Sequence, residues 1–251
     1  MTPTSDSRSP RAPATALVTG AAKRIGRAIA IALASDGWFV AVHFHGSSAP
    51  AEQVVAEIRD AGGRAEAFAA DLSAVAALAP LIDAVADRLG PPACLVNNAS
   101  EFQLDTAETL TEDVWCAHLD INLKAPVFLA QAMARRLPDD AAGNIINIID
   151  QRVWKLTPDF FSYTISKAGL WTATQTLAQA LAPRIRVNAI GPGPTLRSVH
   201  QTDADFASEV ASTLLKAGPT PEDIAAAVRF ILATPSMTGQ MIALDGGQHL
   251  I

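Results

Sequence analysis

Short apolar runs alternate with longer segments of helical periodicity along almost the whole chain. The runs that we expect to form strands cover residues 15–19, 38–44, 64–69, 93–96, 144–149, 186–190 and a last one within 238–247. The segments that we expect to form helices cover residues 25–34, 50–61, 75–89, 115–136, 162–182 and 221–232. Such alternation is typical of a parallel sheet with helices on both faces. The sequence therefore predicts the α/β class with a doubly wound parallel sheet and, at 251 residues, a single domain.

Two regions depart from this alternation. Residues 1–13 are rich in Ser, Pro, Thr and Arg and have no apolar stretch, so we expect a disordered leader rather than a secretion signal. The folded domain is then expected to span residues 14–251. Residues 194–216 follow a strand with only a weak, polar pattern, which predicts a mobile lid over the substrate.

Charge and cysteine content exclude several kinds of partner. A net charge of −6 argues against nucleic acid, which requires a basic surface. The longest stretch without Asp, Glu, Lys or Arg, residues 168–183, is shorter than the ~18 apolar residues that span a bilayer. Cys94 and Cys116 lack metal-ligand spacing and lie in apolar segments, so we expect buried thiols, no metal and a cytoplasmic location.

The first predicted strand ends in a glycine turn. Gly20 and Gly26 flank this turn, and the next helix follows at once. Glycines in this position let a pyrophosphate approach the backbone at a helix N-terminus. Arg24 stands where a third glycine would be expected, and its guanidinium adds a charge-assisted donor to the predicted dinucleotide site.

The second predicted strand bears on the choice of cofactor. NAD-binding chains place Asp or Glu near its end, to accept bonds from the ribose 2′-hydroxyl. No carboxylate occurs between Gly37 and Ala51, and the segment offers the donors His45, Ser47 and Ser48 instead. A 2′-phosphate is therefore admitted, and we expect NADP(H) as the cofactor.

Tyr163 and Lys167 are four residues apart at the start of a predicted helix, so they share one face. A free tyrosine titrates near ~10, and a nearby ammonium favours its phenolate. The pair is therefore a candidate general acid/base, although alone it could be a surface pair. Asp150 ends a predicted strand and brings a carboxyl to the same crevice.

Polar residues also follow other predicted strands. Asp71 could bond an adenine amino group or cap the next helix. Asn98 can fix the main chain through side-chain bonds, and the small Ala99 beside it leaves room for a ligand. The segments 115–136, which contains Asn122, and 162–182 are apolar on all sides, which predicts a partner subunit, and we expect a homotetramer.

From Ala14 to Gly247 the chain resembles the short-chain dehydrogenase/reductase family. The matching motifs are Thr19-Gly20 to Gly26, Asp71, Asn97-Asn98-Ala99, Asn122, Tyr163 to Lys167, Pro192-Gly193 and Asp245-Gly246-Gly247. The resemblance implies a Rossmann-type fold, with Tyr163 as proton donor and Asn122 ordering a water in a proton relay. It also implies that Lys167 holds the nicotinamide ribose and lowers the tyrosine pKa. The cofactor contacts expected from motifs and resemblance together are Gly20, Lys23, Arg24, Ile25, His45, Ser47, Asp71, Leu72, Asn98, Ala99, Lys167, Pro192, Gly193 and Thr195.

Four residues point to one branch of that family. Most members have serine 13 residues before the tyrosine, whereas this chain has Asp150. Together with Arg24, Ser100 and Phe102, Asp150 resembles the pteridine reductases and the bacterial dihydromonapterin or alternative dihydrofolate reductases. In that group the arginine, serine and aromatic belong to the pterin pocket, where the ring stacks between nicotinamide and phenyl. The branch has an arginine after the second strand, where this chain has Gly46.

The chemistry of Asp150 supports the same interpretation. An ionised aspartate only accepts hydrogen bonds, so the substrate should present N–H donors, as a 2-amino-4-oxopteridine does. If burial keeps Asp150 protonated, it becomes a second acid that still suits a ring nitrogen.

Three functions are therefore compared. The favoured one is an NADPH-dependent reductase of a dihydropterin or dihydrofolate C=N bond. The alternatives are a reductase of ketones or 3-oxoacyl groups and a dinucleotide-binding regulator without turnover, and NADPH oxidation across a substrate panel separates the three.

Overall fold

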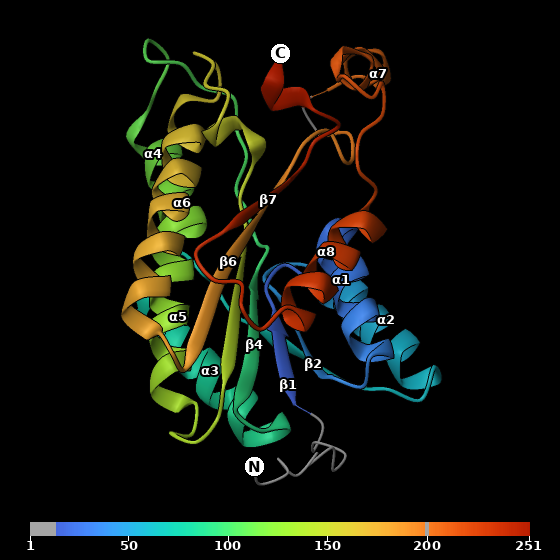
Figure 1. The fold of residues 1–251 in the computed structure, drawn as a ribbon, viewed down its shortest axis with the longest axis vertical. Helices are drawn as coiled ribbons and strands as arrows, with labels where there is room; N and C mark the ends of the chain where they lie inside the picture. Colours follow the sequence, from blue (N-terminus) through green and yellow to red (C-terminus); the bar gives the residue numbers. More distant parts are fainter. Residues whose placement is uncertain (1–13, 199–200) are drawn as a thin grey trace, which may run out of the picture.

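The computed structural model describes residues 14–198 and 201–251, so the predicted leader lies outside the described residues. Seven parallel strands form one sheet in the order β3-β2-β1-β4-β5-β6-β7 (Figure 1). The strands are β1 (Thr15–Val18), β2 (Phe39–Phe44), β3 (Arg64–Ala69), β4 (Pro92–Asn97), β5 (Gly143–Ile148), β6 (Ile185–Pro192) and β7 (Met241–Leu244). The order reverses between β1 and β4, and parallel sheets of this kind bind ligands beyond the carboxyl ends of the strands at such a point. The predicted doubly wound sheet is confirmed.

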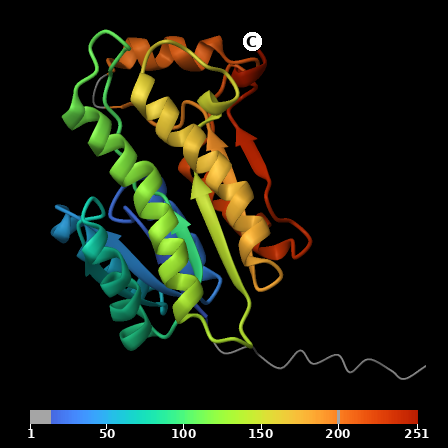
Figure 2. The same ribbon diagram turned by 90° about the vertical axis from the view of Figure 1, so that its left-hand side faces the viewer.

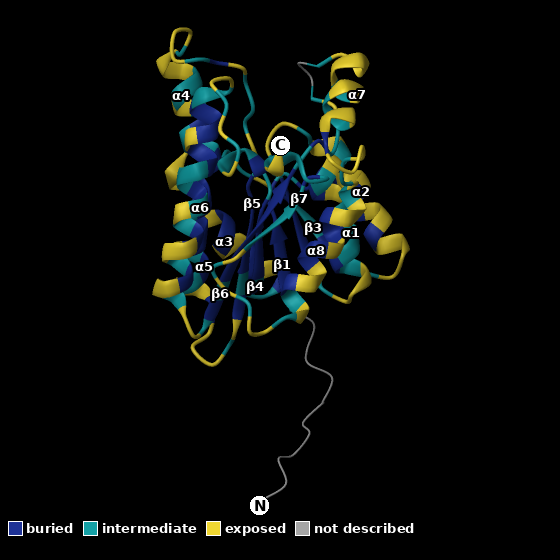
Figure 3. Ribbon diagram, turned by 45° about the horizontal axis from the view of Figure 1, so that its top comes forward, coloured by how far each residue is buried: buried dark blue, intermediate teal, exposed yellow. Residues whose placement is uncertain are grey.

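Helices cover both faces of the sheet (Figure 2). The helices are α1 (Arg24–Ser35), α2 (Ser48–Asp60), α3 (Val75–Leu89), α4 (Glu112–Leu119), α5 (Ala125–Arg136), α6 (Phe161–Leu181), α7 (Asp203–Ser212) and α8 (Pro221–Ala233), with short helical turns η1 (Asp120–Lys124), η2 (Gln151–Val153) and η3 (Gln248–Leu250). One buried cluster joins the sheet to α1, α2 and α8, and another joins it to α3 and α5. Figure 3 shows the central strands as the buried centre of the molecule, the edge strand β7 as intermediate, and the outer helix faces as exposed.

The segment expected as one helix over residues 115–136 is divided into α4, a π-helical turn and α5. The helix begins earlier than predicted because the Thr111 hydroxyl accepts a bond from the Val114 N–H. The π-helical turn η1 carries Asn122, and such turns are frequent at functional sites.

Cys94 is buried as predicted, and burial raises the pKa of its thiol to about 12. The expectation for Cys116 is wrong, because its side chain is exposed. Helix α4 turns His118 inward instead, where the imidazole finds two hydrogen-bond partners. Polar contacts, rather than apolar periodicity, set the buried face of this helix.

The predicted lid contains more regular structure than the sequence suggested. Helix α7 occupies its centre, and a capping box between Thr202 and Asp205 satisfies the first turn. In the described part of the chain, α7 has no buried residue, which explains its weak apolar pattern. It lies beyond the carboxyl ends of the strands (Figure 1). Lid motion stays a prediction, and residues 199–200 lie outside the described residues.

Within the described ranges, no helix is both long and apolar enough to cross a membrane. The same residues contain no cluster of three or more His, Cys, Asp or Glu side chains that could hold a metal ion.

Candidate active site

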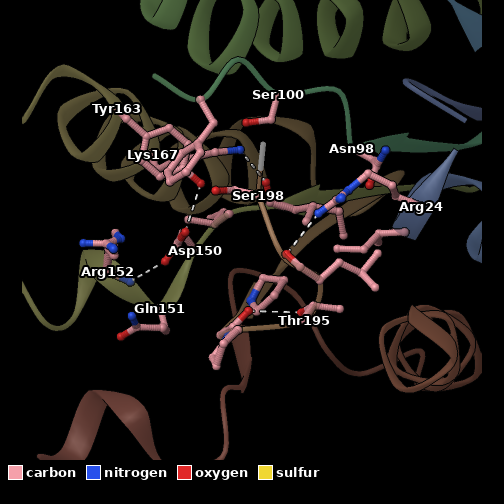
Figure 4. A pocket seen from close by; sticks show the side chains of 18 of the residues that line it. Arg24, Asn98, Ser100, Asp150, Gln151, Arg152, Tyr163, Lys167, Thr195 and Ser198 are labelled. Carbon is pink, nitrogen blue, oxygen red and sulfur yellow. Dashed lines mark hydrogen bonds between the residues drawn. The ribbon is translucent and has the colours of Figure 1, made fainter. Parts of the chain in front are cut away.

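A crevice of about 500 Å³ opens beyond the carboxyl ends of the central strands. It brings together most of the predicted site residues: Gly20, Lys23, Arg24, Ile25, Asn98, Ala99, Ser100, Phe102, Asp150, Tyr163, Lys167, Pro192, Gly193 and Thr195. His45, Ser47, Asp71, Leu72 and Asn122 do not line it. Figure 4 shows Asp150, Tyr163 and Lys167 grouped together, with Arg24 and Asn98 on one side of the group.

The glycine turn leaves the N-terminus of α1 free to bind an anion. No side chain caps α1, whereas α7 and α8 both have capping boxes. Backbone N–H groups at such an end attract phosphate. A Cβ on Gly26 would lie 2.3 Å from the Gly20 carbonyl oxygen, so this glycine is required for packing inside the turn. The turn therefore fits a dinucleotide pyrophosphate.

Arg24 takes the left-handed backbone conformation, with φ of 54°, in the place where a third glycine was expected. Its guanidinium donates to the carbonyl oxygens of Leu196 and Arg197, at 3.0 Å each. The side chain thereby ties the glycine turn to the first residues of the lid. A strained residue held by specific contacts is characteristic of functional sites.

Three polar side chains hold the end of β1 in place. The Asn98 amide donates to the carbonyls of Thr19 (2.8 Å) and Gly20 (3.2 Å), as expected for an asparagine that fixes the main chain. The Thr19 hydroxyl accepts from the Asn98 and Ala99 N–H groups. His43, which sequence reasoning missed, accepts from the Gly20 N–H at Nδ1, and burial lowers its pKa to about 4. The sequence signal that could have identified His43 is its place as the one polar residue in the otherwise apolar strand β2.

The residues predicted to contact the adenosine end lie outside the crevice. Asp71 neither caps α3 nor stays free, because its Oδ1 accepts from the backbone and hydroxyl of Ser73 in the turn before that helix. These bonds lower the pKa of Asp71. The cap at the start of α3 was therefore a wrong alternative, and a contact to adenine stays a prediction.

Tyr163 and Asp150 form a direct hydrogen bond. The phenol donates to Oδ2 of Asp150 at 2.9 Å, and the Arg152 N–H donates to Oδ1 at 2.8 Å. Since both oxygens accept, the arrangement suits an ionised carboxylate. Burial raises the pKa of Asp150, although the Arg152 and Tyr163 donors and nearby charges oppose this shift.

Lys167 does not lower the Tyr163 pKa as expected. Burial and the adjacent Asp150 carboxylate raise the pKa of Tyr163 well above the usual range. Lys167 donates instead to the Ile148 carbonyl at 3.0 Å, and burial lowers its own pKa to about 8. The carboxylate contacts the phenol directly, whereas the ammonium lies 5.6 Å from the ring centroid, so the negative charge dominates.

A buried network beneath Tyr163 fixes the first turn of α6, and sequence reasoning missed it. Asp105 accepts from the N–H and hydroxyl of Ser162. The Ser162 hydroxyl meets His118 Nδ1 at 2.6 Å, and His118 Nε2 accepts from the Gln103 N–H. Burial lowers the pKa of His118, consistent with a neutral ring that donates to Ser162. The network holds the residue next to Tyr163 and so fixes the position of the phenol.

Asn122 is fully buried in the π-helical turn and makes four side-chain hydrogen bonds. Its Oδ1 accepts from Ser100 Oγ and the Glu101 N–H, while its Nδ2 donates to the Glu101 carbonyl and Ser166 Oγ. An amide has two donors and two acceptor positions, so this set is complete. Any water ordered by Asn122 would have to use its main chain, and that role stays a prediction.

Phe102 belongs to an aromatic wall beside the phenol. Its ring stacks on Phe160 with centroids 4.4 Å apart and meets the edge of Tyr163 at 4.7 Å. Phe160, which sequence reasoning missed, takes a left-handed backbone conformation just before α6. The wall gives the crevice a flat apolar side next to two titratable groups.

The fold and this site define the class of protein. The short chain dehydrogenase family matches residues 14–207, and the chain belongs to that family of oxidoreductases. The alternative dihydrofolate reductase FolM of Brucella suis, solved in complex with NADP, is similar at 50% identity and a TM-score of 0.92, covering 95% of this chain and 96% of that chain.

Two further relatives come from other bacteria. An uncharacterized oxidoreductase of Methylorubrum extorquens is 36% identical over 92% of this chain and 96% of its own. A 3-oxoacyl acyl-carrier-protein reductase of Synechocystis is 33% identical over 92% of this chain and 95% of its own.

Proposed function

We propose that this chain is an NADPH-dependent reductase of the C=N bond of a dihydropterin or dihydrofolate. The observation that carries the proposal is the Asp150 carboxylate bonded to the Tyr163 phenol in a crevice with an aromatic wall. A carboxylate accepts from N–H donors, which a pterin ring presents and a simple ketone lacks. The 50% identity to a FolM reductase supports the same branch.

The protein groups divide the reaction between them. NADPH, when bound, supplies the hydride that adds to the carbon of the C=N bond. Tyr163 donates its proton to the nitrogen, and the raised pKa keeps the phenol protonated at neutral pH. Lys167 offsets the negative charge that develops on the phenol oxygen, while Asp150 orients the ring through its N–H groups. Lys167 and the N-terminus of α1 would hold the cofactor.

The test is the oxidation of NADPH by the wild-type protein with dihydrobiopterin, dihydromonapterin and dihydrofolate. Turnover of at least one, at a rate well above that of a ketone panel, supports the proposal. If all three fail and ketones react, the pterin assignment is wrong.

A second candidate is a reductase of ketones or 3-oxoacyl groups. The observation that favours it is the 33% identity to a 3-oxoacyl reductase along nearly the full chain. A ketone or 3-oxoacyl substrate has no N–H donor for the Asp150 carboxylate, so this function is the weaker candidate.

Cofactor preference gives a direct prediction. We expect NADPH to be used in preference to NADH, because no carboxylate follows β2 to repel a 2′-phosphate. Gly46→Asp should shift the preference toward NADH, and the site tolerates a side chain because nothing lies within 4 Å of a Cβ built there. The measurement is kcat/KM for each cofactor. Equal use of NADH by the wild type would contradict the expectation.

A second prediction concerns pH. The ammonium of Lys167 is charged below its pKa of about 8 and loses its proton above it, so the Kd for NADPH should rise as pH increases through about 8. The charge of Asp150 raises this Lys167 pKa, so Asp150→Asn should move the transition to lower pH. Fluorescence titration of NADPH between pH 7 and 9.5 measures both. An unchanged transition in the variant would contradict the coupling.

We also propose that the protein is a cytoplasmic homotetramer. Phe128 of α5 and Ile165 of α6 are 40% and 37% exposed. Leu215 and Phe230 are also exposed, and they line a second pocket together with residues of β7. Apolar groups on these two surfaces favour contacts between copies. Sedimentation analysis tests the assembly, and a monomer at micromolar concentration would exclude it.

A further inference from the structure

Arg152 is a cation that lines the crevice, and its guanidinium has no role in the reaction described above beyond lowering the pKa of Asp150 by its charge. Its Nη1 donates to the Thr157 hydroxyl at 3.0 Å, and its guanidinium lies 4.8 Å from the centroid of the Phe160 ring. These contacts hold the half-buried side chain beside the aromatic wall. Residues 14–198 and 201–251 provide no ion-pair partner for it, whereas Arg27, Arg136 and Arg229 each pair with a carboxylate.

Apart from Lys23, an exposed residue of the glycine turn at the cofactor end, the other charged groups of the crevice have their own partners. Arg24 donates to lid carbonyls, and Lys167 to the Ile148 carbonyl. Asp150 accepts from the Arg152 backbone and from Tyr163. Glu209 of α7 accepts from the amides of Gln201 at 2.7 Å and Gln248 at 3.2 Å. At the end of the crevice away from the glycine turn, the guanidinium of Arg152 is therefore the cation best placed to receive an anion.

The Arg152 guanidinium lies away from the cofactor end of the crevice. In Figure 4, Arg152 lies on one side of the Tyr163–Asp150 pair, and Arg24 of the glycine turn lies on the other. The glycine turn and Lys167 would hold the cofactor, and the glycine turn lies on the side away from Arg152 (Figure 4). An anion at Arg152 therefore belongs to the substrate, beyond the ring that Asp150 orients.

We infer that Arg152 binds a carboxylate on the tail of the substrate, so that the enzyme favours a dihydrofolate over a dihydropterin with a neutral tail. The inference rests on the proposed function. A planar guanidinium can meet a carboxylate with two parallel bonds. Because the site is only half-buried, this contact should weaken as salt is added.

The test compares Arg152→Gln with Lys155→Gln, which removes a charge from the same segment at a position that does not line the crevice. In Arg152→Gln, the KM for dihydrofolate should rise about 10-fold, while the KM for dihydrobiopterin changes less than about 2-fold. Lys155→Gln should leave both values unchanged, and Arg152→Lys should recover part of the loss. Added salt should raise the dihydrofolate KM of the wild type and not that of Arg152→Gln.

The outcomes separate this inference from the proposed function. If Arg152→Gln raises the KM equally for both substrates, Arg152 contacts the ring or supports folding. That result overturns the inference but not the proposed function. So does an unchanged KM for dihydrofolate. If the wild type oxidises NADPH with dihydromonapterin but not with dihydrofolate, the inference fails and the proposed function stands. If none of the three dihydropterin or dihydrofolate substrates is reduced, the proposed function fails, and the inference fails with it.

Discussion

Tyr163→Phe is expected to lower kcat for the dihydropterin by about 10²- to 10⁴-fold, because the variant removes the only phenol that can protonate the C=N nitrogen. The chain has a single tyrosine, so no second phenol can replace it. The Kd for NADPH should change less than about 2-fold, because Lys167 keeps its bond to the Ile148 carbonyl. Stopped-flow turnover and fluorescence titration measure the two quantities.

Thr164→Val provides a matched control for this variant. The Thr164 hydroxyl is also buried in the first turn of α6, and it has no hydrogen-bond partner among the described residues. Its removal should leave kcat within about 2-fold of the wild type. If Tyr163→Phe and Thr164→Val lower the rate equally, the loss reports packing in α6, and the assignment of Tyr163 as the acid is wrong.

The fold could be predicted because its signals are local. The boundaries of β3 and α3 coincide with the predicted ones, since β3 begins directly after the Gly62-Gly63 turn and α3 ends directly before Gly90. Helix α7 was missed because its stability comes from the Thr202–Asp205 capping box rather than from an apolar face. The π-helical turn around Asn122 was also missed, since its side chain bonds to residues distant in the sequence.

Sequence motifs predicted which residues form the site but not the contacts between their side chains. Spacing on a helix placed Tyr163 beside Lys167, and strand ends placed Asp150 near them. The prediction that Lys167 lowers the Tyr163 pKa was wrong. Only the folded structure shows that Asp150 accepts a hydrogen bond from the phenol while Lys167 donates to a backbone carbonyl. The contact of Phe160 with Phe102 joins residues far apart in the chain and has no sequence signature.

Asp150→Asn should lower kcat/KM for the dihydropterin by about 10- to 100-fold, because a charge-assisted bond contributes roughly 1.5 to 3 kcal/mol. Tyr163 and the Arg152 N–H donate to different oxygens of Asp150, and an asparagine replaces one of these oxygens with an NH2 donor, so one of the two bonds is lost. The Kd for NADPH below pH 7 should stay within about 2-fold. Asp159→Asn is the matched control, since that exposed carboxylate lies in the same segment but outside the crevice.

Asp150→Ser distinguishes the two candidate functions. A serine hydroxyl can donate to a carbonyl oxygen, so this variant should lose dihydropterin turnover and gain activity on simple ketones. Its kcat/KM on both substrates is the measurement. If the serine variant keeps full dihydropterin activity, Asp150 does not recognise the ring through N–H groups.

The single tyrosine makes the electrostatic part of this argument measurable. Asp150 raises the Tyr163 pKa both by its charge and by the hydrogen bond, so removing the charge in Asp150→Asn should let the phenol ionise at a lower pH than in the wild type. Ultraviolet difference titration follows this phenolate without interference from another tyrosine. A lower Tyr163 pKa together with weaker dihydropterin turnover would show that Asp150 acts by binding the ring, since a more acidic phenol alone would favour proton transfer. An unchanged Tyr163 pKa would mean that the carboxyl is already protonated in the wild type, and Asp150 would then serve as a second acid.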